Sequence, residues 1–103
     1  MSRQKIRATF SKTGDMRYIS HLDLLRLFDR ALRRAGLPIE FTKGFNPRPR
    51  MSFKRALKLG LESAFEEAVF YMAEAIGPAA FIKSMNSKLP EGISISTAEE
   101  EKF

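Results

Sequence analysis

The chain has no cysteine and a single histidine, and these two shortages exclude several kinds of site. Without thiols, its 103 residues form no disulfide, no zinc or iron–sulfur site built on thiolates, and no cysteine nucleophile. A metal site would need carboxylates, and the 12 Asp and Glu residues show no spacing typical of metal ligands. The sequence therefore predicts no metal and no other cofactor.

Long apolar runs are missing as well. No stretch approaches the roughly 20 consecutive apolar residues of a membrane-spanning helix, and the N-terminal residues lack the apolar run of a signal peptide. The chain still has 44% hydrophobic residues and nine Phe, enough to fold around one modest core. We expect a single cytoplasmic domain over residues 1–103, with no membrane partner.

Arginine is absent after residue 55, and charge is unevenly divided along the chain. Residues 1–58 hold 15 cations and 4 anions, whereas residues 59–103 hold 3 cations and 8 anions. A strongly cationic half favours RNA or another polyanion as the partner, because Lys and Arg neutralise phosphates. A solvated surface and a protein partner are the competing interpretations.

The densest basic stretch, residues 42–55, mixes cations with aromatic rings and with residues that stiffen the backbone. Gly44 permits a positive φ, while Pro47 and Pro49 hold their neighbours extended, so binding costs this loop less entropy than an ordinary loop. Cations would contact phosphates, and a ring would stack on a base. The predicted nucleic-acid-binding residues here are Lys43, Phe45, Arg48, Arg50, Phe53, Lys54 and Arg55.

An amphipathic helix is the clearest element in the sequence. It begins at His21, after the capping residue Ser20, and ends at Gly36. At 100° per residue its apolar side chains fill one broad sector that predicts contact with a core. That sector holds Leu22, Leu24, Leu25, Leu27, Phe28, Ala31, Leu32 and Ala35. The opposite face is mainly basic, and Arg30, Arg33 and Arg34 extend the predicted path for nucleic acid.

The remaining periodicities predict four strands and a second helix. Residues 5–11 and 93–97 alternate as strands, residues 67–73 have a β-branched and aromatic centre, and Pro78 opens the second helix. The other strand is expected in two pieces, 38–42 and 50–53. The order β-α-β-β-α-β is the split arrangement of an α+β ferredoxin-like fold, an antiparallel sheet with two helices on one face. The acidic runs 66–67 and 99–101 are expected to be solvated and unpaired. The C-terminal tail is expected to be frayed or to be the stump of a longer protein.

His21 is the candidate for any proton transfer, because imidazole is the side chain that ordinarily titrates near neutral pH. Tyr18, Lys12 and Ser20 are close to it in sequence, and such a group could cleave RNA through the 2′-hydroxyl. The alternatives are a structural imidazole packed at the start of the helix and an imidazole that contacts a ligand. The sequence favours the structural role, since a catalytic role depends on geometry that sequence does not give.

Several segments together resemble a bacterial radical-SAM-linked domain family of unknown function. They are Arg17–Asp23, Arg30–Pro38, Gly44–Phe53 and Leu59–Ser63, and the similarity continues through Leu89–Ile93. The resemblance implies a module fused to, or encoded beside, a radical SAM protein, with this chain as the N-terminal part of a longer one. It also implies an accessory role, because a chain without cysteine does not ligate the iron–sulfur cluster by itself.

Three functions follow as hypotheses. The first is a non-enzymatic RNA-binding module linked to a radical SAM system. The second is a docking or substrate-presenting subunit for a radical SAM enzyme, and the third is a metal-independent RNA endonuclease that uses His21.

Overall fold

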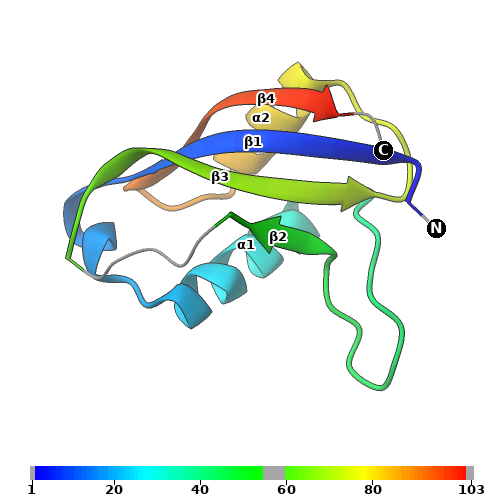
Figure 1. Ribbon diagram of the computed structural model, residues 1–103, viewed down its shortest axis with the longest axis horizontal. Coiled ribbons are helices and arrows are strands. Elements are labelled where there is room, and N and C mark those ends of the chain that lie inside the picture. The colour runs from blue at the N-terminus through cyan, green and yellow to red at the C-terminus, as the bar shows by residue number, and fades with distance from the viewer. Residues whose placement is uncertain (1, 55–59, 102–103) are drawn as a thin grey trace.

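The protein folds as a four-stranded antiparallel sheet with two helices on one face (Figure 1). The computed structural model describes residues 2–54 and 60–101. No helix in these two ranges is long and apolar enough to cross a membrane. The elements are β1 (Gln4–Lys12), the 3-10 helix η1 (Gly14–Tyr18), α1 (His21–Ala35), β2 (Met51–Phe53), β3 (Ser63–Met72), α2 (Pro78–Asn86) and β4 (Ile93–Glu101).

The strands lie in the order β2-β3-β1-β4. β1 and β3 form the centre and pair antiparallel, with Ile6 opposite Phe70. β4 pairs with the other side of β1, with Phe10 opposite Ile95. This order confirms the predicted α+β ferredoxin-like fold.

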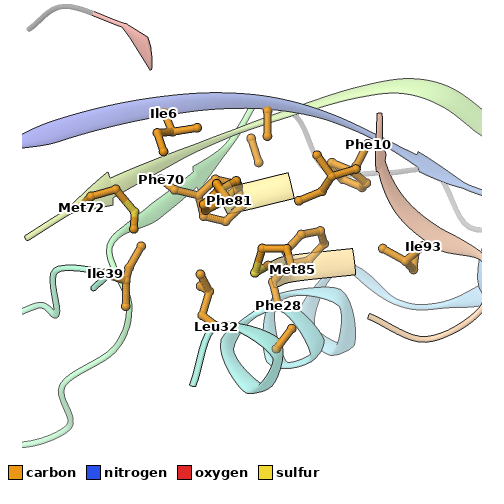
Figure 2. Packing of buried hydrophobic residues seen from close by; sticks show 14 of the residues in the cluster. Ile6, Phe10, Phe28, Leu32, Ile39, Phe70, Met72, Phe81, Met85 and Ile93 are labelled. Atoms are coloured by element: carbon orange, nitrogen blue, oxygen red, sulfur yellow. The ribbon is translucent and has the colours of Figure 1, made fainter. Parts of the chain in front are cut away.

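One hydrophobic cluster joins the helices to the inner face of the sheet (Figure 2). The Phe28 ring of α1 lies at its middle, with its centroid 5.1 Å from that of Phe10, 5.3 Å from Phe53 and 5.9 Å from Phe70. α2 adds Phe81, whose centroid is 5.1 Å from that of Phe70. Every second residue of β1 is buried, so the remaining side chains of that strand lie on the open face of the sheet.

α1 begins and ends where the sequence predicts. The Ser20 hydroxyl accepts a hydrogen bond from the Asp23 amide at 3.1 Å, and Gly36 ends the helix with a φ of 65°. The predicted apolar sector was too broad, however. Leu22 is 50% exposed and Leu25 is half-buried, whereas Leu24, Phe28, Ala31 and Leu32 are buried. Sequence periodicity predicts which side of the helix faces the core. How many side chains on that side are buried depends on the shape of the sheet against which the helix packs.

The prediction that the acidic runs are unpaired was wrong, and residues 99–101 of the tail belong to a strand rather than to a frayed end. β4 continues to Glu101, and Arg7 of β1 forms ion pairs with Glu99 and Glu101. In the other run, Glu66 is buried and accepts a hydrogen bond from Ser63, and Glu67 pairs with Lys54. Because β1 pairs with β4, Arg7 lies beside Glu99, which is about 90 residues later in the chain.

The outer edge of β4 is partly covered by α2. The Asn86 side chain at the end of α2 donates to the Ile95 carbonyl at 3.0 Å, and its amide oxygen accepts from the Ile95 N–H at 2.8 Å. The amide thus makes both bonds that a neighbouring strand would make at this residue.

Burial on α1 yields a matched pair of substitutions. Leu24 is fully buried, so Leu24→Ala should lower the free energy of unfolding by roughly 2–5 kcal/mol. Leu22→Ala removes the same atoms from a half-exposed side chain near the same end of the helix, and should cost less than half as much. Urea denaturation of both variants measures the difference, and equal losses would mean that α1 packs through a different face.

Candidate nucleic-acid interface

Residues 40–50 form a two-stranded ribbon, here called the basic ribbon, that projects from the body of the domain (Figure 1). The Thr42 N–H donates to the Arg48 carbonyl at 2.7 Å, and the Arg50 N–H donates to the Glu40 carbonyl at 2.7 Å. Phe41 forms a bridge with Pro49 between them. Both pieces expected for the second strand therefore pair, but only β2 is regular, and residues 39 and 41 make isolated bridges.

A polar cluster fixes the base of the ribbon. Arg50 bonds the Glu40 carboxylate at 2.6 Å and the Ser2 hydroxyl at 3.0 Å, and its guanidinium lies 4.3 Å above the Tyr71 ring. Ser2 donates a hydrogen bond to the same carboxylate at 2.7 Å. The hydrogen bond from Arg50, and then that from Ser2, lower the pKa of Glu40 from 4.5 to about 2. Arg50, predicted as a phosphate contact, is thus already paired at the base of the ribbon.

The tip of the ribbon carries the exposed groups. Phe45 is fully exposed, and it follows Gly44, whose φ of 125° lies in a region that side-chain-bearing residues rarely adopt. Lys43 and Arg48 are exposed on either side, and neither side chain forms a hydrogen bond or ion pair within the described ranges. The tip therefore presents one bare ring between two unpaired cations.

α1 continues this positive surface. The Arg33 guanidinium lies 4.8 Å above the Phe41 ring, so the helix and the ribbon are in contact. Arg33 also pairs with Asp29 at 2.5 Å. Arg30 and Arg34 are exposed and make no side-chain ion pair in the part of the chain described. We call the following residues the basic surface: Arg30, Arg33, Arg34, Lys43, Phe45 and Arg48.

Two further predicted contact residues lie outside the basic surface. The Phe53 ring packs edge-on against Phe10 and Phe28 in the core, so it does not face solvent as a stacking platform would. Lys54 lies on the open face of the sheet, 3.1 Å from Glu67. Arg55 falls outside the described residues.

The open face of the sheet is the other surface rich in charge. Two hollows of about 190 and 300 Å³ share Arg7 and Glu67 in their linings. The charged residues on β1, β3 and β4 here, together with Lys54, are three cations and three carboxylates: Lys5, Arg7, Lys54, Glu67, Glu99 and Glu101. Sequence analysis missed Arg7 and its partners, although the alternation of β1 and its pairing in the predicted fold would have placed them together.

His21 lies in the first turn of α1, with its ring 5.9 Å from that of Phe53 and edge-on to it. Its Nδ1 is buried and has no hydrogen-bond partner among the described residues. The neighbours proposed for catalysis are engaged: the Tyr18 hydroxyl bonds Arg17 at 2.8 Å, Ser20 caps the helix, and Lys12 is buried with Nζ 3.4 Å from the Arg17 carbonyl. The described residues also contain no group of three or more His, Asp or Glu suited to a metal.

The fold and this surface define a small α+β domain with a projecting cationic ribbon. The chain belongs to the family described as "Uncharacterized protein conserved in bacteria (DUF2344)", which it matches over residues 5–102. A comparison with curated proteins finds no match.

The paired Glu40 predicts a pH dependence. Its pKa is lower in the folded state than in the unfolded state, so the ionised carboxylate stabilises the fold above pH about 4.5, and this contribution is lost as the pH falls toward 2. Glu40→Gln should remove this part of the acid sensitivity. The difference in the free energy of unfolding between wild type and variant should therefore shrink as the pH falls from about 4.5 to about 2. Urea unfolding at a series of pH values measures the convergence. Arg50→Gln, which removes the main cause, should converge in the same way, and a constant difference would contradict the assignment.

Proposed function

We propose that the protein is a non-enzymatic RNA-binding module whose basic surface holds the phosphate backbone. The observation that carries the proposal is the excess of cations on this surface. Within the described ranges, its five Lys and Arg have one carboxylate as an ion-pair partner, that of Asp29, whereas the open face of the sheet balances three cations with three carboxylates. Unpaired cations release counterions from a nucleic acid, and a balanced surface does not.

The arrangement of the arginines supports a strand that crosses from helix to ribbon. Arg30 and Arg34 are four residues apart on α1, which is about 6 Å along the helix axis. Arg33 reaches Phe41 and so connects this row to the ribbon that ends in Lys43 and Arg48. A polyanion that lies along these arginines would therefore reach the tip of the ribbon. The carboxylate beside its path, that of Asp29, is neutralised by Arg33.

The link to a radical SAM protein is part of the same proposal and rests on the resemblance of the sequence. In this view the chain presents RNA to a separate enzyme that carries the iron–sulfur cluster. The alternative is that the basic surface docks onto an acidic protein. RNA cleavage without magnesium that is lost in His21→Ala would instead favour the endonuclease hypothesis.

Salt dependence tests the proposal. For single-stranded RNA, the logarithm of the binding constant should fall with the logarithm of the salt concentration, with a slope of about −0.7 for each phosphate contact. Replacing Lys43 and Arg48 together by Ala should make the slope shallower by about 1.4. Fluorescence anisotropy with a labelled oligonucleotide measures it.

A charge-matched control uses two exposed lysines outside the basic surface. Lys83→Ala with Lys88→Ala removes the same charge from α2 and the turn after it, and should leave the slope near that of the wild type. Binding that is insensitive to salt, or equal effects of the two double variants, would rule out the basic surface as the RNA site.

A further inference from the structure

We infer that the ligand of the basic surface is RNA with unpaired bases, and that Phe45 stacks on one of those bases. This inference rests on the proposed RNA binding and adds the class of RNA and the residue that selects it. Phe45 differs from most of the other aromatic rings near the protein surface.

Most of the other surface rings already have a cation above them. The guanidinium of Arg17 lies 4.4 Å above Tyr18, that of Arg33 lies 4.8 Å above Phe41, and that of Arg50 lies 4.3 Å above Tyr71. These contacts occupy a ring face that a base would need. The open face of the sheet therefore lacks a free platform at Tyr71, although ferredoxin-like sheets can bind RNA through rings on that face.

Phe45 and Phe65 are the described rings that are largely exposed and have no such cation. Phe65, 82% exposed, lies on β3 at the edge of the charge-balanced sheet face. Phe45 lies between Lys43 and Arg48, which make no ion pair within the described ranges. A base on the Phe45 ring would therefore have phosphate-binding groups on both sides, as single-strand binding requires.

The tip is held in position by the rest of the ribbon. The hydrogen bonds between Thr42 and Arg48 close the ribbon next to the tip, and the Arg50–Glu40 pair closes its base. Gly44 gives the turn its positive φ. The ring is therefore presented by an ordered support, which reduces the entropy lost when a base stacks on it.

Stacking of this kind selects unpaired bases. In a continuous RNA duplex both faces of each base are covered by neighbours, and the A-form major groove is too deep and narrow for side chains to read. Duplex RNA would then contact the cations only. Loops, bulges and single strands offer base faces to Phe45, so they should bind more tightly than a duplex of equal charge.

The test compares Phe45→Ala and Phe65→Ala on two ligands, an unstructured RNA oligonucleotide and a hairpin-free duplex of the same sequence. Phe45→Ala should weaken single-strand binding by roughly 5- to 150-fold, the range for the loss of one base–aromatic stack, and leave duplex binding unchanged. Phe45→Trp should retain the affinity. Both Phe45 and Phe65 are exposed, so neither truncation removes a core side chain.

A second readout reports the stack directly. Single-stranded RNA with 2-aminopurine in place of one adenine should change its fluorescence on binding wild type, and this change should disappear with Phe45→Ala but persist with Phe65→Ala. The salt slope of Phe45→Ala should equal that of wild type, because no phosphate contact is removed. Unchanged single-strand affinity with a normal salt slope would overturn the stacking inference and leave RNA binding intact. Failure of wild type to bind either RNA would overturn both.

Discussion

Both legs of the basic ribbon depend on the backbone of one residue in β3. The Tyr71 carbonyl accepts from the Glu40 N–H at 2.8 Å, and the Tyr71 N–H donates to the Arg50 carbonyl at 3.0 Å. The Tyr71 side chain then supports the Arg50 guanidinium from below. The ribbon is thus attached to a central strand of the sheet, and its tip keeps a defined place relative to α1. Without this attachment, cations from residues 30–34 and 43–48 would not form one surface.

The fold brings part of the basic N-terminal half of the chain next to the acidic C-terminal half. Some cations of the N-terminal half are paired in the fold with the acidic C-terminal half, as Arg7 is with Glu99 and Lys54 with Glu67. Among the described residues, the cations that form no ion pair include Arg30 and Arg34 of α1 and Lys43 and Arg48 at the ribbon tip. The local positive field of the basic surface therefore comes from fewer residues than the count over residues 1–58 implies. Such a local field would orient an approaching polyanion before contact.

The sequence predicted the features that depend on local periodicity. The spacing of Leu24, Phe28 and Leu32 gave α1, the capping residues Ser20 and Gly36 gave its ends, and the order of the elements gave the sheet. Features that depend on distant neighbours were missed. The ring of Phe53 is in a basic, loop-rich segment, so nothing local showed that Phe10 and Phe28 would enclose it. Likewise, Arg50 looks like a free cation until the fold brings it to Ser2 and Tyr71.

The Asn86 side chain affects whether a second copy of the domain can pair with the outer edge of β4. An edge strand with exposed N–H and C=O groups is a template on which another chain can add a strand. At Ile95 both groups are already bonded by the Asn86 side chain, which is attached to α2 and so to the core. A strand from another molecule would have to displace this amide before it could pair along the first half of β4. At this residue the Asn86 side chain therefore blocks the backbone pairing by which a second molecule would extend the sheet.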